Sequence, residues 1–161
     1  MTESSFRLAS ARRVRVLLAF ALFAATPRVA RAQAVAVVVN PGNALEDLST
    51  DKLRRLYLGQ TKTFPDGSHA RLARHTPSAP VFDHAALGLQ PEIVRSRWMA
   101  MIFRGEASVL PVELAKAEDV KRFVREHPDA IGFLPAGQVD ATVKAIRIDG
   151  KRPSDAGYGV H

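Results

Sequence analysis

The sequence predicts an α/β domain in which helices flank a mixed sheet. Three observations predict it: an apolar, β-branched run at residues 34–39, a helix with clear start and stop signals at 49–59, and further strand-like and helix-like segments that alternate as far as residue 148. Short elements that alternate in this way are typical of layered α/β folds. We therefore expect the order strand, helix, strand, helices, strand, strand.

The first two elements have the clearest local signals. Residues 34–39 read AVAVVV and precede Asn-Pro-Gly, as in a strand that is buried on both faces near the centre of a sheet. In the next segment Ser49 is placed to cap a helix, because its side-chain oxygen can accept a hydrogen bond from a free backbone N–H of the first turn. Gly59 suits the left-handed conformation that often ends a helix.

Weaker signals predict the elements in the middle and toward the end of the chain. A turn is expected at 64–67 (FPDG), where proline and glycine take positions that suit their backbone angles. Pro91 suits the first turn of a helix that Gly105 ends. The remaining segments are a strand at 70–74, a loop at 76–80, a helix at 81–89, a helix opened by Glu118 and Asp119 with Lys121, Arg122 and Arg125 turned outward, and strands at 130–134 and 142–148.

The two ends of the chain are expected to lie outside the folded domain. Residues 1–32 have the order of a secretory signal peptide: arginines at 12, 13 and 15, an apolar run at 16–26, and Ala-Arg-Ala just before Gln33. The apolar run is too short for a bilayer, which needs about 20 residues. We therefore expect cleavage near Ala32, a periplasmic or secreted protein, a domain at 33–150 and a C-terminal surface tail at 151–161.

Composition restricts the function. The six arginines and one glutamate of the first 32 residues leave 17 basic and 15 acidic residues in the rest of the chain, a balance that does not favour nucleic-acid binding. The chain has no cysteine, so it has neither disulfides nor thiol chemistry. Its five histidines lack metal-ligand spacing, and no nucleophile, phosphate-loop or dinucleotide motif is present. We therefore expect no enzyme activity, no metal and no cofactor.

Several landmarks occur in an order that resembles one known family. They are VVNP at 38–41, LSTDKLRRLYLG at 48–59, FPDG at 64–67, Trp98 with Phe103 and Gly105, Pro111, PDAIGF at 128–133, and Tyr158. This ordered set is similar to the phosphate-type periplasmic substrate-binding proteins of ABC transporters. Those proteins close two lobes on an oxyanion. The chain resembles the second lobe alone, which implies a single lobe of a periplasmic-binding-protein-like fold.

The ligand-binding turn of that family has a counterpart here, with differences. The family has an arginine at a strand end and then a Gly-Ser-Gly-Thr turn that opens a helix; the corresponding residues are Arg74 and then Pro77-Ser78-Ala79-Pro80. A helix N-terminus binds anions through free backbone N–H groups, and the two prolines have none. The resemblance implies that a small anion such as phosphate would meet Arg74, Ser78, and the N–H groups of Val81 and Phe82. The alternative is an ordinary surface arginine and an N-cap serine.

Two functions follow from the resemblance. The first is binding of a small solute, with an oxyanion among the candidates, in support of uptake. The second is a periplasmic accessory or interaction protein that derives from one lobe and binds no ligand. An apolar stripe bears on this choice, because it either packs in the core or marks a contact with a partner: Trp98, Met99, Met101, Ile102 and Phe103. The partners considered are a second copy of the chain and a membrane transporter or sensor subunit.

Overall fold

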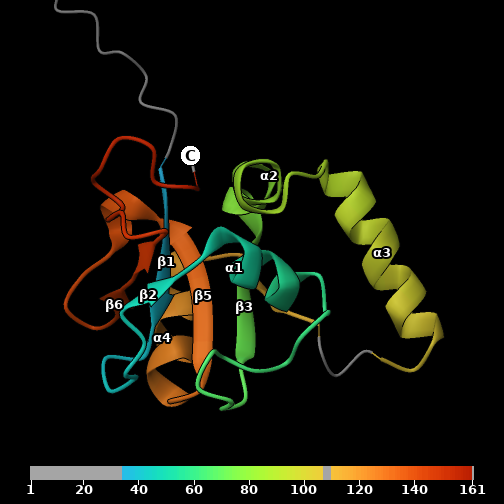
Figure 1. Cartoon of the computed structure of the whole chain (residues 1–161), viewed down its shortest axis with the longest axis horizontal. Coiled ribbons are helices and arrows are strands. Elements are labelled where there is room, and N and C mark those ends of the chain that lie inside the picture. The colour runs from blue at the N-terminus through green and yellow to red at the C-terminus, as the bar shows by residue number, and fades with distance from the viewer. Residues whose placement is uncertain (1–33, 107–109, 161) are drawn as a thin grey trace, which may run out of the picture.

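A mixed five-stranded sheet forms the centre of the molecule (Figure 1). The computed structural model describes residues 34–106 and 110–160. The strand order is β4-β3-β5-β1-β6, with β1 antiparallel to β5 and β6, and β3 parallel to β4 and β5. A separate parallel pair joins β2 (Asp47–Leu48) to β7 (Arg147–Ile148). The strands of the main sheet are β1 (Val35–Val39), β3 (Arg71–His75), β4 (Val112–Leu114), β5 (Ala130–Pro135) and β6 (Lys144–Ala145).

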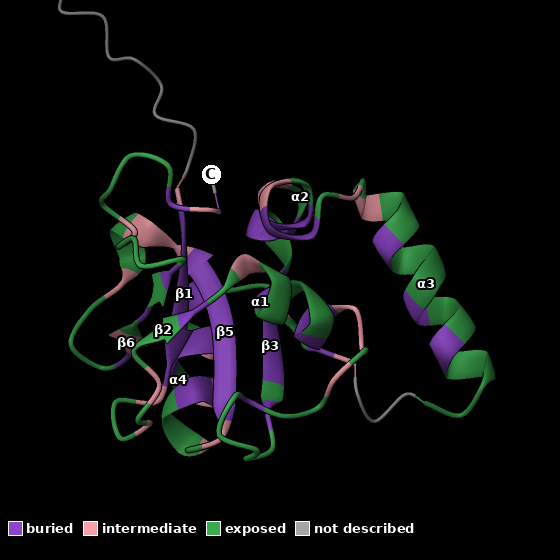
Figure 2. Ribbon diagram, viewed as in Figure 1, coloured by how far each residue is buried: buried purple, intermediate pink, exposed green. Residues whose placement is uncertain are grey.

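Helices cover both faces of this sheet, which confirms the predicted α/β class. In Figure 1, α4 (Ala117–Glu126) lies behind the sheet and α1 (Thr50–Tyr57) lies in front of it. The front layer continues through α2 (Ala79–Phe82) into α3 (Pro91–Phe103), which projects from the body. The valines of β1 alternate between the two layers, so that β1 is buried along its whole length (Figure 2). This double burial explains why its sequence is an unbroken apolar run.

The local signals place the helix ends as predicted. The Ser49 side chain caps α1 and accepts a hydrogen bond from the backbone N–H of Lys52 at 3.3 Å. Gly59 and Gly105 follow α1 and α3 with φ angles of 68° and 78°, in the left-handed region that glycine adopts without strain. α3 begins at Pro91.

α4 packs very closely on the sheet where β5 carries Gly132. A Cβ atom at this position would lie 3.0 Å from Val120 Cγ1 of α4 and 3.2 Å from Ala73 Cβ of β3. Both distances are shorter than ordinary van der Waals contacts between carbon atoms. The absence of a side chain at residue 132 therefore sets the spacing between this helix and the sheet.

The end of the chain contradicts the prediction of a surface tail. Tyr158 and Val160 are buried. The Tyr158 hydroxyl accepts a hydrogen bond from the backbone N–H of Val37 at 3.1 Å, and the Val160 carbonyl accepts one from the N–H of Val35 at 3.3 Å. Residues 151–157 are exposed or half-buried, so the correction concerns the end of the segment, where two apolar side chains pack against the core despite the glycine, proline and charged residues around them.

Two further predictions of local structure need correction. Lys121 was expected to point outward, but only 8% of its side chain is exposed, and its Nζ contacts Glu118 Oε1 at 2.7 Å and Asp140 Oδ2 at 2.8 Å. These carboxylates raise the pKa of Lys121, chiefly because Asp140 accepts a hydrogen bond from its ammonium group. The strand expected at 142–148 is divided into β6 and β7, which join different sheets, with buried Ile146 between them.

The predicted signal peptide at 1–32 lies outside the described residues. Within residues 34–106 and 110–160, no helix has the length and apolar character needed to cross a bilayer.

Candidate functional site

The predicted ligand residue Arg74 forms a buried ion pair with a carboxylate of its own chain. Arg74 Nη1 and Nη2 donate to Asp83 Oδ1 and Oδ2 at 2.6 and 2.8 Å. The side chains are 7% and 0% exposed, respectively. Guanidinium groups make the same bidentate pair of hydrogen bonds with bound oxyanions. The Asp83 carboxylate therefore lies where an anionic ligand of Arg74 would lie.

An irregular helical segment brings Asp83 to this position. Residues 76–78 form a 3₁₀ turn, α2 follows at Ala79, and Asp83–Leu87 continues as a π-helix. The helix thus begins before the predicted residue 81, and the expected loop at 76–80 is already helical. π-Helical turns are rare and often occur at functional sites. A π-helical turn contains more residues than an α-helical turn, so it changes which side chains face the sheet.

Two aromatic residues complete a buried polar cluster around Arg74. The guanidinium carbon of Arg74 lies 4.8 Å from the centre of the Trp98 ring, a cation–π distance. Trp98 Nε1 donates to the carbonyl of Tyr57 at 3.0 Å, and the Tyr57 hydroxyl donates to the carbonyl of Ala73 at 2.8 Å. Burial raises the pKa of Tyr57, against a smaller opposing effect of Arg74. We call Arg74, Asp83, Trp98 and Tyr57 the Arg74 cluster; it ties β3, α1 and α3 together.

One donor of the cluster has no hydrogen bond. Arg74 Nε is buried and unpaired in this sense, and the nearest acidic atom is Glu113 Oε1, 3.5 Å away on a side chain that is 58% exposed. Each of the other two guanidinium nitrogens donates one of its two N–H groups to Asp83. Access to the remaining donors of Arg74 is restricted, because its side chain is only 7% exposed.

The side chains of the four predicted ligand residues contact different neighbours, whereas the prediction for Val81 and Phe82 concerns their backbone N–H groups. Arg74 contacts Trp98 of α3, whereas Ser78 lies beside the start of α4 and exchanges a 2.8 Å hydrogen bond with His75 Nδ1. Phe82 is fully buried, and its ring stacks on Phe133 with a centroid distance of 3.9 Å. Val81 is partly buried against the same core. Their shared role in binding a ligand stays a prediction.

Asp83 is the residue of this site that sequence reasoning missed. An acidic residue in the first turn of a helix is ordinarily explained by the helix dipole, so the sequence around Asp83 does not suggest a buried partner. The available signal was its position nine residues after Arg74, in the helical segment that directly follows strand β3. Spacing alone does not distinguish this pair from an exposed acid.

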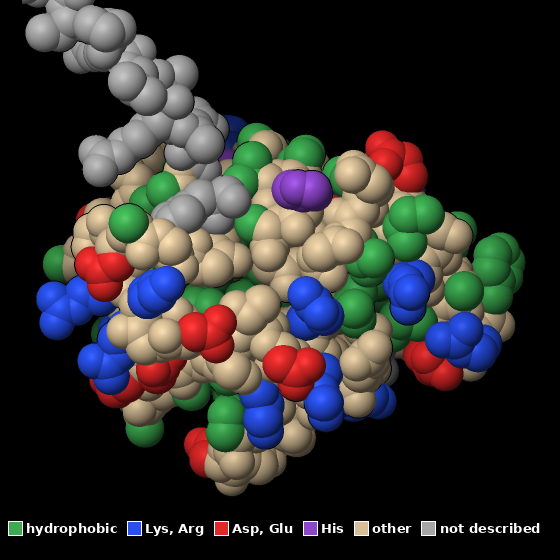
Figure 3. All heavy atoms as spheres, turned by 45° about the horizontal axis from the view of Figure 1, so that its top comes forward, with side chains coloured by type: hydrophobic (Ala, Val, Ile, Leu, Met, Phe, Trp, Pro, Cys, Tyr) green, Lys and Arg blue, Asp and Glu red, His purple; other side chains and the backbone are tan. Residues whose placement is uncertain are grey.

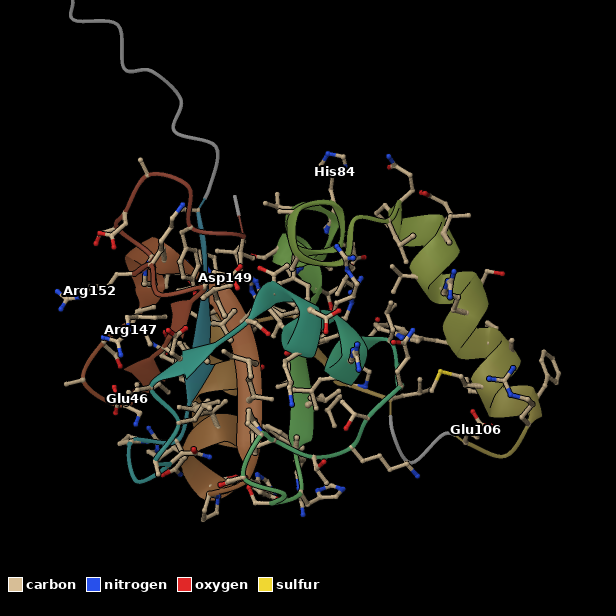
Figure 4. All side chains as sticks on the ribbon, viewed as in Figure 1. Glu46, His84, Glu106, Arg147, Asp149 and Arg152 are labelled. Atoms are coloured by element: carbon tan, nitrogen blue, oxygen red, sulfur yellow. The ribbon has the colours of Figure 1, made fainter. Side chains whose placement is uncertain are left out.

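The histidines and acidic residues of the described part of the chain form no metal-ligand cluster. Within that part of the chain, no group of three or more potential ligands is arranged to hold a metal ion. His84 points away from the body above the segment that follows α2, while Glu46, Arg147 and Arg152 lie at the end of the molecule opposite to α3 (Figure 4).

α3 divides the predicted apolar stripe between the core and the surface. Trp98 and Met101 are buried together with Val94. The other face of the helix is exposed: Ile93 at 47%, Met99 at 45%, Ile102 at 44% and Phe103 at 84%. Figure 3 shows hydrophobic side chains gathered at the end of the molecule that holds α3, with Lys or Arg side chains among them. We call these four exposed residues the α3 face.

Comparisons with known proteins give similarity at the level of structure. No protein-family model matches the chain, and no curated protein matches its sequence. A phosphate ABC transporter substrate-binding protein from Clostridium perfringens with bound phosphate aligns with a TM-score of 0.58 and 18% identity, over 73% of this chain and 45% of that one. An ABC-type phosphate transport receptor from Vibrio cholerae gives 0.52 and 21%, over 75% and 48%. PstS from Borrelia burgdorferi gives 0.53 and 10%, over 75% and 49%.

These alignments confirm the fold that the resemblance implied. The chain has the mixed-sheet α/β architecture of phosphate ABC transporter substrate-binding proteins, and it spans about half the length of the solved structures it matches. The names of the first two neighbours denote a substrate-binding protein and a transport receptor, not enzymes.

Proposed function

We propose that this protein is an exported accessory protein that contacts a partner protein through the α3 face and does not carry phosphate at Arg74. The observation that supports the proposal is that α3 has apolar side chains on opposite sides, one side buried and the other exposed. Contiguous exposed apolar side chains are typical of partner contacts.

Charges on α3 indicate the chemistry of the partner. Arg95 and Arg97 are exposed and form no ion pair with the described residues. Unpaired arginines beside exposed aromatic and aliphatic side chains are characteristic of protein interfaces. A partner segment that offers apolar side chains flanked by carboxylates matches this face in both respects. Glu92 is also exposed on α3, and its negative charge would weaken binding of this helix to a purely anionic surface such as a lipid bilayer.

The Arg74 cluster supports the second half of the proposal. A phosphate ion would have to displace the Asp83 carboxylate from a site where the pair is almost fully buried. Removal of one partner from a buried ion pair costs about 3–5 kcal/mol, a large part of the binding free energy that a small anion can supply. In this chain Arg74 therefore positions α3, and through it the α3 face, instead of holding a solute.

Calorimetric titration with phosphate and sulfate at low salt tests the solute half of the proposal. We expect no saturable heat from the natural sequence and no difference in the Arg74→Ala variant. Saturable phosphate binding that disappears in Arg74→Ala would contradict the proposal and support the solute-binding function instead. The same preparation tests export, since mass spectrometry of protein recovered from the cell envelope is expected to find Gln33 as the first residue.

Photo-crosslinking in the source cells tests the partner half. A crosslinking amino acid at Met99 is expected to give one discrete protein adduct, which Arg95→Glu with Arg97→Glu removes. The matched control is the same amino acid at Arg122, which lies on α4 and is 58% exposed. Equal adducts from both positions, or an adduct that persists after charge reversal, would refute the α3 face as the contact.

A further inference from the structure

Few interactions attach α3 to the rest of the molecule. Among the described residues, no backbone hydrogen bond joins residues 91–103 to a residue outside 90–106. One side-chain hydrogen bond does so, from Trp98 Nε1 to the carbonyl of Tyr57 at 3.0 Å. Figure 1 shows the helix projecting to one side of the body. We propose that α3 detaches from the body as a unit while the sheet stays folded.

The buried side of α3 is small, and the core beneath it is held together without it. Of the 13 residues of α3, only Val94, Trp98 and Met101 are buried. The stacked rings of the front layer, Phe82 and Phe133, belong to other elements and lie 3.9 Å apart between their centroids. The apolar cluster between α4 and the sheet contains no residue of α3. Detachment of α3 therefore removes one edge of the front layer and leaves its centre in place.

Both ends of α3 have glycines that can act as hinges. Gly88 lies between the π-helical segment and α3 and has a φ angle of 65°, and Gly105, beyond the other end, has one of 78°. Glycine adopts either sign of φ at little cost, and hinge movements are absorbed by a few residues at the ends of elements. Arg74 and Asp83 both lie on the body side of Gly88, so detachment of α3 does not break their ion pair.

Detachment changes the surroundings of the Arg74 cluster. It removes the Trp98 ring from the Arg74 guanidinium, 4.8 Å away, and breaks the hydrogen bond to Tyr57. The inner apolar side of α3 then becomes exposed together with its outer side. A molecule that binds the inner side would stabilise the detached state, because a ligand shifts a conformational equilibrium toward the state that it binds better. The movement itself does not depend on the partner contact proposed above.

Native-state hydrogen exchange, followed by NMR at several low urea concentrations, tests this proposal. A free helix of 13 residues is marginally stable, so the amides of α3 exchange once it detaches. We expect the amides of Trp98 and Met101 to share one protection factor, about 100-fold or more below those of β1. Their exchange should also depend less on urea, because the detached state exposes less surface than the unfolded chain. Protection equal to that of β1, or unequal protection along α3 without urea dependence, would overturn the proposal.

Two kinds of variant separate detachment of α3 from unfolding of the whole domain. Gly132→Ala disturbs the contact between α4 and the sheet, which the detached state keeps, so it should lower the protection of β1 about fivefold or more and leave that of α3 unchanged. Val124→Ala, at a fully buried residue of the same cluster, is the second variant of this kind. Trp98→Phe removes a hydrogen bond that is lost in both the detached and the unfolded state, so it should lower the protection of α3 and of β1 by the same factor. Equal falls at α3 and β1 in Gly132→Ala or Val124→Ala, or unchanged protection of α3 in Trp98→Phe, would overturn the proposal.

Discussion

Replacement of Asp83 by alanine tests whether the Arg74 cluster is closed and buried. The change removes both hydrogen-bond acceptors of Arg74, at 2.6 and 2.8 Å, and leaves a guanidinium that is 7% exposed without its counter-charge. An uncompensated buried charge of this kind costs about 3–5 kcal/mol. For a domain of this size the corresponding fall in Tm is about 10–20 °C.

Denaturant unfolding followed by the fluorescence of Trp98 is the appropriate assay. Trp98 is the single tryptophan of the chain and stacks on the Arg74 guanidinium, so it reports on the cluster directly. The matched control is Asp51→Ala, which removes a 2.9 Å pair with Arg55 whose side chains are 62% and 56% exposed. Exposed pairs of this type contribute about 0–1 kcal/mol. A loss in Asp83→Ala no larger than that in Asp51→Ala would refute the reasoning.

Two additions distinguish a closed anion site from simple structural damage. Formate is small enough to replace the missing carboxylate, and at ten times its Kd it would restore about 1.4 kcal/mol to Asp83→Ala by binding only the folded state. Formate should not stabilise the natural sequence, in which Asp83 occupies the position. The double variant Arg74→Met with Asp83→Leu is expected to recover most of the lost stability, since apolar pairs commonly replace buried ion pairs without loss.

Three further predictions concern the rest of the fold. Gly132→Ala is expected to lower the free energy of unfolding by about 1–3 kcal/mol, because the added methyl group overpacks the contact with α4. Chemical unfolding measures this change, and Gly137→Ala is the control, since a Cβ there meets nothing within 4 Å and should be near neutral. Equal effects of the two substitutions would contradict the packing argument. The hydrogen bond from Lys121 lowers the pKa of Asp140, so the pair stabilises the fold above about pH 4 and this contribution disappears as the pH falls further. Acid unfolding of Asp140→Asn should therefore lack this part of the pH-dependent loss of stability. Burial raises the pKa of Tyr158 to about 12, so stability should hold below about pH 10 and fall between pH 10 and 12. Burial also raises the pKa of Tyr57, which contributes to the same loss, so Tyr158→Phe should make the alkaline loss smaller without removing it. An unchanged profile would contradict a contribution from Tyr158.

Local signals predicted most of the framework because their causes are local. An unbroken apolar run has few alternatives to a strand buried on both faces, and residues 35–39 form that strand. A serine N-cap and glycines beyond the helix ends act through neighbouring backbone groups, so Ser49, Gly59 and Gly105 could be interpreted without knowledge of the rest of the chain. The ordered landmarks then led to the correct fold, as the structural alignments show.

The features that escaped prediction depend on distant partners. Asp83 is an ordinary first-turn acid until a π-helical turn aims it at Arg74. Tyr158 lies in a segment rich in turn-forming residues and becomes a core residue only through contact with β1. α3 has apolar residues on its buried side and on its exposed side, so its composition did not show that Ile102 and Phe103 are left uncovered. Composition shows which residue types such segments contain, whereas which of them are buried depends on contacts made only in the folded protein.

The pairing of β1 also has a consequence for how the chain acquires its shape. β1 has its ladder partners in β5 and β6, about 90 to 110 residues later along the chain, and its N–H at Val37 reaches Tyr158 beyond them. A ribosome therefore makes nearly the whole chain before this strand can be completed on either side, and such long-range pairing is slow. Until then the apolar run has no strand partners, so this part of the chain cannot complete its fold. The exposed apolar segment makes the incomplete chain prone to aggregation.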